Sequence, residues 1–253
     1  MTRGNRAARL LGPVIDTGRL LGAPGAYARF LRERRRYSEL PESEALSWAD
    51  DYPQLWDRQA SSPYDEHYFL QDVWAAQRIA ELAPTEHVDV GSRVDLVGFL
   101  TAITRVVFVD IRPLETDVPG LTCVSGSVLN LPFDDRSLQS VSCLHVAEHI
   151  GLGRYGDPLD PAGTRKAARE LARVLAPEGQ LLFSLPVGRE RVEFNAHRIL
   201  SPGSALDLFG DLELLEFSGV GDNGNFARYR DPDKLAASDY ACGMFRFTRT
   251  QDT

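Results

Sequence analysis

The chain has 253 residues, of which 43% are apolar, 25% charged and 9% aromatic, as in a soluble globular protein. These proportions exclude an intrinsically disordered or collagen-like chain, and the length suits one large α/β domain with an appendage. Cys123, Cys143 and Cys242 are odd in number and form no C-x-x-C pair, so we expect no disulfide framework, no zinc site and a cytoplasmic location. No run of about 18 apolar residues is present, so we expect no membrane span.

Charge is unevenly distributed along the chain, whose net charge is −8. The first 36 residues carry nine Arg against Asp16 and Glu33, whereas the remaining residues carry 19 basic and 34 acidic side chains. Because such an acidic body repels phosphate backbones, we expect a small-molecule partner and no nucleic acid. We interpret residues 1–36 as a solvated basic arm, with peripheral contact to an anionic membrane surface or docking on the acidic body as alternatives.

The segment after the arm is interrupted by prolines. Pro41, Pro53 and Pro63 break residues 37–65 into predicted loops and short helical turns. From Asp65 to Pro84 the apolar residues have helical spacing, with Asp65 as the expected N-cap. The sequence therefore predicts a helical cap or lid over residues 37–84.

Past Pro84, short apolar runs alternate with amphipathic segments. This rhythm predicts a Rossmann-like, doubly wound α/β domain over residues 85–253, with a mostly parallel sheet. We expect the last two strands to pair antiparallel at a sheet edge, and no helix between residues 219 and 242. The predicted helices are 94–103, 163–175 and 202–209, and the predicted strands are 87–91, 106–111, 122–126, 139–144, 180–185, 212–218 and 243–248.

Two features at the ends of the first two strands indicate a nucleotide-like ligand. The first strand ends in Asp89-Val90-Gly91-Ser92-Arg93 and runs directly into a helix, which places a tight turn at the carboxyl edge of the sheet. About twenty residues later Asp110 ends the second strand, where its carboxylate can accept both hydroxyls of a ribose. Taken alone, an acid at a strand end is equally consistent with a turn-forming residue.

Five segments in the order of one enzyme superfamily make this interpretation more specific. The Asp89–Gly91 turn, Asp110, the loop 126–135, the strand running into Glu148-His149, and the turn 176–180 together resemble class I S-adenosylmethionine-dependent methyltransferases. The resemblance covers residues 85–250 and implies S-adenosylmethionine as cofactor. The cofactor contacts that it implies are Asp89, Gly91, Ser92, Arg93, Asp110, Ile111, Arg112, Gly126, Ser127, Val128 and Leu144.

A narrower resemblance and two departures refine this expectation. The segments 68–74, 87–92 and 148–158 are similar to a bacterial methyltransferase-like family of unknown function, DUF268. The superfamily's G-x-G-x-G turn is reduced to Gly91-Ser92-Arg93, which gives the backbone less freedom to approach a cofactor. Ser127 stands where the superfamily has an Asp, and a hydroxyl accepts a hydrogen bond without the added strength of a charge.

The catalytic hypothesis concerns His145, Glu148 and His149, which follow the fourth strand. At positions i, i+3 and i+4 of a helical start they share one face, and we expect His149 to act as general base, with His145 second. The H-x-x-E-H spacing also occurs in zinc peptidases, but there it lies within a long helix. A divalent metal held by these three side chains and a purely structural role for Glu148 are further alternatives.

We expect the acceptor to contact the loops that follow the later strands, at Arg154, Tyr155, His197 and Arg198. The sequence thus predicts an enzyme that transfers a methyl group to a hydroxyl of a small polar acceptor, such as a sugar or a natural-product precursor. An NAD-dependent oxidoreductase and a catalytically inactive methyltransferase-fold binding protein are the alternatives.

Overall fold

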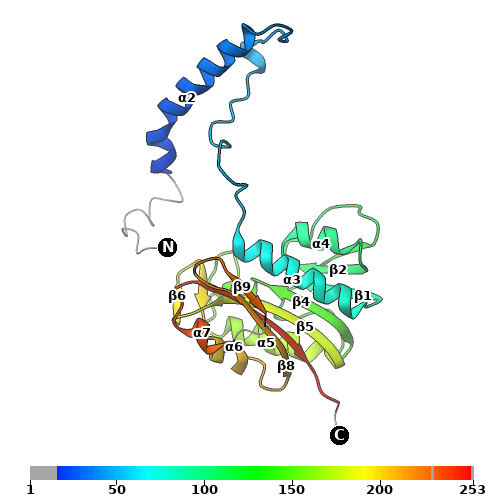
Figure 1. Ribbon diagram of the computed structural model, residues 1–253. Helices are drawn as coiled ribbons and strands as arrows, with labels where there is room; N and C mark the ends of the chain where they lie inside the picture. The colour runs from blue at the N-terminus through cyan, green and yellow to red at the C-terminus, as the bar shows by residue number, and fades with distance from the viewer. Residues whose placement is uncertain (1–15, 229–230, 252–253) are drawn as a thin grey trace. The chain divides into compact units, whose positions relative to one another are not determined.

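The computed structural model describes residues 16–228 and 231–251, and its contacts divide the chain into two units after Tyr64. In the first unit, the side chain of Asp16 caps helix α2 (Thr17–Ser38), and the 3-10 helix η1 spans Trp48–Asp50 (Figure 1). The guanidinium of Arg34 pairs with Asp51 at 2.7 Å and stacks on Trp48 at 3.6 Å, which fastens α2 to the following segment. No helix among the described residues is long and apolar enough to cross a membrane.

The second unit is built on a sheet, and within the described residues this sheet has eight strands in the order β3-β2-β1-β4-β5-β10-β8-β9. The first five are parallel, and β10 is antiparallel to both of its neighbours, β5 and β8. The predicted mostly parallel α/β fold with an antiparallel last strand is confirmed. The strands are β1 (Glu86–Val90), β2 (Arg105–Asp110), β3 (Leu121–Ser125), β4 (Leu138–Leu144), β5 (Leu175–Val187), β8 (Glu213–Val220), β9 (Phe226–Arg228) and β10 (Ala241–Thr248).

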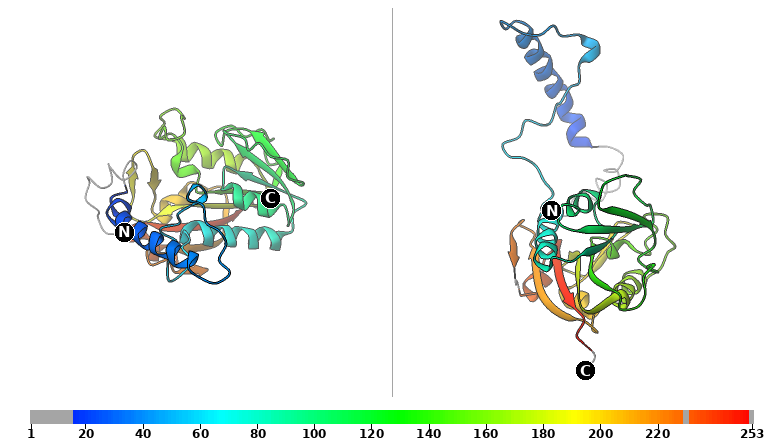
Figure 2. Two further views of the ribbon diagram at one scale, coloured as in Figure 1. Left: turned by 90° about the horizontal axis from the view of Figure 1, so that it is seen from above. Right: turned by 90° about the vertical axis from the view of Figure 1, so that its right-hand side faces the viewer.

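Helices cover both faces of this sheet and bury an apolar core on each (Figure 2). On one face lie α3 (Glu66–Leu82) and α4 (Val94–Leu100), and on the other α5 (Gly163–Val174) and α6 (Pro202–Asp207). Because both faces are covered, the central strands are almost wholly buried, as in β4 and β5. Because the helices cover the faces of the sheet, a binding site is expected at the ends of the parallel strands.

The structure differs from the predicted elements where the elements are short. The expectation of no helix between residues 219 and 242 is wrong, because α7 spans Asp233–Ala236 and β9 precedes it. Leu235 of α7 packs so closely on Gly219 that a Cβ there would lie 2.5 Å from its Cδ1, so tertiary packing stabilises this one-turn helix. The hairpin of β6 (Arg191–Glu193) and β7 (His197–Ile199) was not predicted either, and the predicted turn 176–180 forms the irregular start of β5.

A buried ion pair fastens α3 to the sheet. Arg78 Nε lies 2.6 Å from Glu216 Oε2, and both side chains are 2% exposed. Trp74 Nε1 and Ser218 Oγ donate to Glu216 Oε1 at 2.9 and 2.8 Å, so the carboxylate is fully hydrogen-bonded. Because α3 belongs to this second unit, its first turn, with His67 and Tyr68, is held at the carboxyl edge of the sheet. The predicted division of the chain at residues 36 and 84 stays a prediction.

Candidate active site

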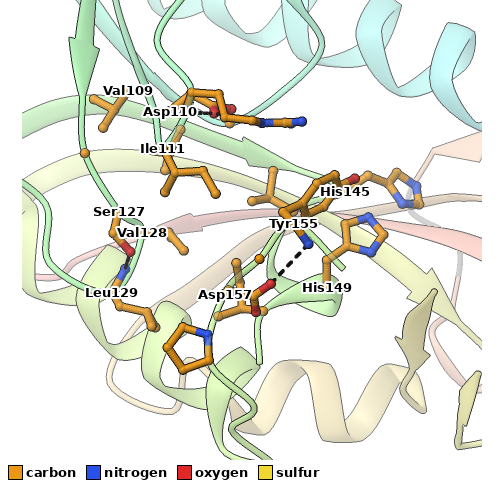
Figure 3. A pocket seen from close by; sticks show the side chains of 18 residues that line it. Val109, Asp110, Ile111, Ser127, Val128, Leu129, His145, His149, Tyr155 and Asp157 are labelled. Carbon is orange, nitrogen blue, oxygen red and sulfur yellow. Dashed lines mark hydrogen bonds and ion pairs between the residues drawn. The ribbon is translucent and has the colours of Figure 1, made fainter. Parts of the chain in front are cut away.

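A pocket of about 300 Å³ lies where the parallel strands β1 to β4 end (Figure 3). The structure brings seven of the predicted cofactor contacts to its wall, namely Gly91, Asp110, Ile111, Arg112, Gly126, Ser127 and Val128. His145, His149 and Tyr155 line the same pocket, and in Figure 3 they lie across it from Ser127 and Leu129. Seven predicted cofactor contacts therefore share one cavity with two of the predicted catalytic residues, His145 and His149.

Gly91 and Asp110 form the part of the wall that a ribose would touch. Gly91 has φ 72°, and a Cβ there would lie 3.2 Å from Val146 Cγ1, so this position requires glycine. Asp110 Oδ1 accepts from the backbone N–H of Arg112 at 2.6 Å, and its Oδ2 lies 3.8 Å from the Cβ position of Gly91. The only guanidinium within 4 Å among the described residues is that of Arg112, at 3.9 Å and largely exposed, so Asp110 is not held in a buried ion pair.

Four other predicted cofactor contacts lie outside this pocket. Asp89 is buried and accepts hydrogen bonds from Ser92 N–H at 3.0 Å and from the hydroxyl of Ser142. Ser92 Oγ in turn accepts from Leu144 N–H at 3.1 Å. These three residues join the turn after β1 to strand β4. Arg93 pairs with Asp95 at 3.0 Å and, with Ser92, lines a neighbouring pocket of about 400 Å³.

The remaining wall has the properties that an adenine ring needs. Ile111, half-exposed, and Val128 supply apolar surface. Gly126 also lines the pocket, and a Cβ there would lie 2.7 Å from Val109 Cγ1, so a side chain does not fit. Ser127 Oγ accepts from Leu129 N–H at 3.2 Å, which fixes the loop after β3. An acidic group for the ribose beside apolar surface for a base fits an adenosine moiety.

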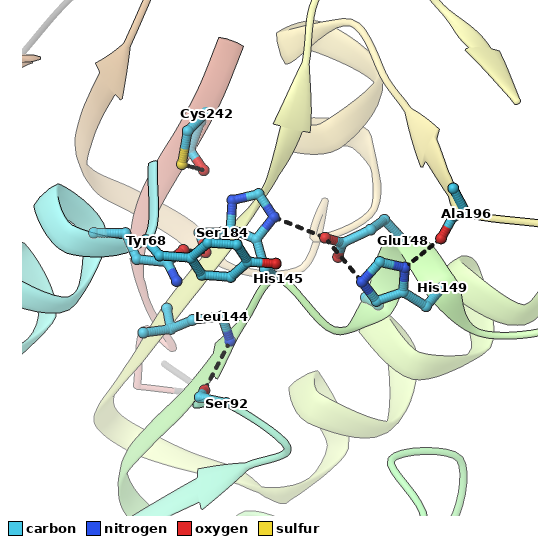
Figure 4. A network of polar contacts seen from close by, with 12 residues as sticks. Tyr68, Ser92, Leu144, His145, Glu148, His149, Ser184, Ala196 and Cys242 are labelled. Carbon is cyan, nitrogen blue, oxygen red and sulfur yellow. Dashed lines mark hydrogen bonds and ion pairs between the residues drawn. The ribbon is translucent and has the colours of Figure 1, made fainter. Parts of the chain in front are cut away.

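His145, Glu148 and His149 form a buried polar network at the end of β4 (Figure 4). Glu148 Oε1 lies 2.8 Å from His145 Nδ1 and 3.7 Å from His149 Nε2. Burial disfavours the charged form of His145, but Cys242 and Glu148 beside the ring hold its pKa well above the usual value. Burial likewise acts to raise the pKa of Glu148, but His145 outweighs it and holds that pKa below its usual value. The two groups therefore form an imidazolium–carboxylate pair.

The other imidazole of the network, His149, is in the opposite state. Burial lowers its pKa below the usual value, although Glu148 opposes this shift, so the ring is neutral at pH 7. Its Nδ1 lies 2.6 Å from the carbonyl oxygen of Ala196. Arg154 Nη1, a donor, also lies 3.3 Å from Nδ1, but the carbonyl contact is much the shorter. Because a carbonyl oxygen only accepts, we assign the proton to Nδ1 and the lone pair to Nε2. His149 Nε2 is thus a proton acceptor placed beside an anionic carboxylate.

The predicted helical start is a single 3-10 turn, η2 (Ala147–His149), and His145 lies outside it with φ 54°. The spacing i, i+3 still brings His145 and Glu148 together. Among the described residues no group of three or more His, Cys, Asp or Glu side chains is arranged to hold a metal ion. The zinc-peptidase interpretation and the divalent-metal alternative therefore lack a set of ligands in this part of the chain.

The structure places some of the predicted acceptor contacts at or near the pocket and one of them elsewhere. Tyr155 lines the pocket, and Arg154 lies beside it, donating to the carbonyl of Ala196 at 3.1 Å. His197 lies with its ring centroid 6.3 Å from that of His149. Arg198 is buried and donates to the backbone of Ile150 and Asp160 and to Thr164 Oγ1, so its guanidinium fastens a loop and does not face an acceptor.

Two residues of the site were missed by the sequence analysis. Tyr240 lies just before β10, with its ring centroid 5.2 Å from those of His67 and His197. Asp157 lines the pocket and accepts from Gly151 N–H at 2.6 Å. Asp157 lies in the segment 148–158 that carries the DUF268 resemblance, which could have indicated it. Tyr240 follows a stretch with no periodic pattern, and no signal in the sequence indicates it.

The model of one protein family matches residues 133–221, and its description is "Caenorhabditis protein of unknown function, DUF268". This match includes the segment 148–158, and it confirms the resemblance predicted from that segment. No curated protein matches the chain in sequence.

Solved structures with the same fold are numerous. The N-methyltransferase NodS from Bradyrhizobium japonicum, in complex with S-adenosyl-L-homocysteine, has a TM-score of 0.51 at 16% identity and covers 80% of this chain and 94% of its own. The cyclase SpnF has a TM-score of 0.56 at 14% identity and covers 78% of this chain and 87% of its own. Since a cyclase shares the fold, the fold alone does not determine the reaction. The chain thus has a methyltransferase-like fold, and its residues 133–221 match the DUF268 model.

Proposed function

We propose that this protein binds S-adenosylmethionine in the pocket at the ends of β1 to β4 and transfers its methyl group to a hydroxyl of a small polar acceptor. The observation that carries the proposal is that Asp110 and His149, an imidazole whose Nδ1 is held by the carbonyl of Ala196, line one cavity. A dinucleotide-binding oxidoreductase would need a more open glycine turn than the one that Val146 covers at Gly91.

The residues of the pocket would divide the work as follows. Asp110 would accept the ribose hydroxyls, Ile111 and Val128 would flank the adenine, and Ser127 would lie at its edge. When bound, S-adenosylmethionine supplies an electrophilic methyl group on a sulfonium, which leaves as a neutral thioether once the methyl carbon is bonded to the acceptor oxygen. Holding the two reactants in line is itself worth several kcal/mol of the barrier.

His149 would accept the proton of the acceptor hydroxyl. His149 Nε2 is unprotonated, and the hydrogen bond from Nδ1 to Ala196 fixes the orientation of the ring. Once Nε2 takes the proton, the carboxylate of Glu148, 3.7 Å away, stabilises the imidazolium that forms. Glu148 lies on the side of the base nitrogen, and the carbonyl of Ala196 holds the opposite nitrogen, the place that a carboxylate takes in a His–Asp dyad. General-base catalysis contributes about 10²- to 10⁴-fold.

Calorimetric titration with S-adenosylhomocysteine tests cofactor binding. Asp110→Asn should weaken binding about 10- to 100-fold, since hydrogen bonds to a charged group contribute about 1.5–3 kcal/mol. Asp117→Asn, which neutralises an exposed acid in the loop after β2, is the matched control and should bind as the wild type does. Equal affinities of the two variants would contradict the proposed role of Asp110. Competition by NAD would favour the oxidoreductase, and the absence of any binding would favour a scaffold.

A further inference from the structure

A set of rings continues from the pocket and surrounds Glu148. Neighbouring members have ring centroids between 5.2 and 6.3 Å apart, and they come from α3, the ends of β4 and η2, β7 and the residue before β10. Followed from each ring to its neighbour, the members are Tyr68, His145, His67, Tyr240, His197 and His149. We call this set, with Glu148, the ring cluster. Figure 4 shows Tyr68 and the two imidazoles on either side of the carboxylate.

The ring cluster contains hydrogen-bonding atoms that the described part of the protein does not satisfy. Glu148 is 1% exposed, and its Oε2 has no hydrogen-bond partner among the described residues. His149 Nε2 offers a lone pair and lies 3.7 Å from the other carboxylate oxygen, which cannot donate to it. A buried carboxylate oxygen without a donor is costly, so these atoms indicate a bound molecule that carries O–H or N–H groups.

The charge of the ring cluster restricts what that molecule can be. Glu148 is an anion, and the His145 imidazolium compensates it. Burial lowers the pKa of His67 to about 4 and lowers those of His149 and His197, so these rings are neutral. Burial raises the pKa of Tyr68 and of Tyr240, so both phenols keep their protons. The imidazolium–carboxylate pair carries no net charge and the other rings are neutral, so the ring cluster offers no excess charge to an ionic ligand and favours a neutral one.

We propose that the ring cluster is the acceptor subsite and that it takes a neutral, polyhydroxylated ring of the sugar class. The ring faces would contact the C–H surface of such a molecule, and Glu148 Oε2 would accept from one hydroxyl. A second hydroxyl would lie at His149 Nε2. Its O–H proton passes to Nε2, its oxygen bonds the methyl carbon, and the C–S bond of the sulfonium breaks. This inference rests on the proposed methyl transfer and adds the class of acceptor.

Saturation-transfer NMR on the full chain loaded with S-adenosylhomocysteine tests this assignment. The probes are methyl glycopyranosides of differing stereochemistry, with glucose 6-phosphate, glucosamine and catechol as anionic, cationic and planar phenolic competitors. We expect a neutral glycoside to receive saturation, and Tyr240→Leu and His67→Leu each to reduce that signal at least about fivefold. Tyr52→Leu, which replaces an 85% exposed ring of the first unit, is the control and should leave the signal unchanged.

Each outcome separates the subsite from the cofactor site. If S-adenosylhomocysteine binds but no glycoside does, or if a charged or phenolic probe binds better, the sugar assignment is overturned and the proposed methyl transfer stands. If the signal survives both ring substitutions, the glycoside lies elsewhere and the ring cluster is not its site. If S-adenosylhomocysteine itself does not bind, the proposed function fails first. Circular dichroism spectra of the two variants verify that each is folded.

Discussion

The ion pair between Arg78 and Glu216 gives a quantitative test of how α3 is held on the sheet. Both side chains are 2% exposed, and Glu216 also accepts from Trp74 and Ser218. Glu216→Gln removes the buried negative charge and leaves the guanidinium of Arg78 with only the half-exposed carboxylate of Glu81, 2.7 Å from its Nη1, as a charged partner. Breaking one side of a buried pair costs about 3–5 kcal/mol. For a domain of this size each kcal/mol lowers the melting temperature by about 2–4 °C, so we expect a fall of about 10 °C.

Thermal unfolding followed by circular dichroism measures this loss. Lys166→Gln is the control, because it breaks an exposed pair with Asp160 at 2.7 Å and should cost less than about 1 kcal/mol. The double variant Arg78→Met, Glu216→Leu should recover part of the loss, because no charge then stays unpaired. If Glu216→Gln melts within about 2 °C of the wild type, the ion pair does not fasten α3, and the argument that it positions His67 and Tyr68 is refuted.

The same variant has a predicted pH dependence. Burial acts to raise the pKa of Glu216, but its hydrogen bonds with Arg78, Trp74 and Ser218 outweigh this and hold the pKa below the usual value. A carboxylate with a depressed folded pKa stabilises the fold above its unfolded pKa of about 4.3, and this contribution is lost as the pH falls through the folded value. The difference in stability between wild type and Glu216→Gln should therefore shrink below about pH 4.

Two further predictions concern buried positions near the site. His87 lies between the hydroxyls of Ser140 and Ser142, and burial lowers its pKa to about 3. Below about pH 6.5 the unfolded chain protonates His87 and the folded chain does not, so the free energy of unfolding should fall by up to about 1.4 kcal/mol per pH unit. His87→Gln should flatten that slope in urea titrations at different pH values. Equal slopes for the variant and the wild type would contradict the burial of a neutral His87. Gly163→Ala should lower the free energy of unfolding by about 1–3 kcal/mol, because its Cβ would collide with the carbonyl of Ile150. Gly98→Ala has open space around its Cβ and should stabilise α4 by about 0.5–1 kcal/mol. Thermal melts of both glycine variants decide this, and equal shifts would contradict the packing argument.

The fold was predictable from the sequence where periodicity is strong. Strands such as β4 and β5 are continuous apolar runs because both faces of the sheet are covered, and this pattern is visible without a structure. The short elements were not predictable, because a one-turn helix such as α7 has no period of its own. It exists because Leu235 fits over Gly219, and these two residues are brought together only by the completed sheet.

The residues of the site likewise differ in how far the sequence predicts their positions. Asp110 was indicated by its place at the end of a strand, since chain order and sheet geometry alone bring it to the edge where Gly91 turns. Arg198 was expected at the acceptor and instead donates to Ile150, Asp160 and Thr164. Its hydrogen-bond partners lie more than thirty residues away in the chain, so only the folded arrangement assigns it to the loop.

The two histidines beside Glu148 show most clearly what the sequence leaves open. His145 and His149 are the same residue type on either side of one carboxylate, and the spacing predicts only that they meet. In the structure His145 is buried and donates to the carboxylate, which keeps it charged, whereas His149 donates from Nδ1 to a neutral carbonyl and stays neutral. A site can make one of two like groups a charged partner and the other a base when their environments push the two pKa values apart. The proposed ranking of His149 above His145 as general base therefore rests on which hydrogen-bond acceptor each ring reaches, and those acceptors, Glu148 and Ala196, lie on different elements of the fold.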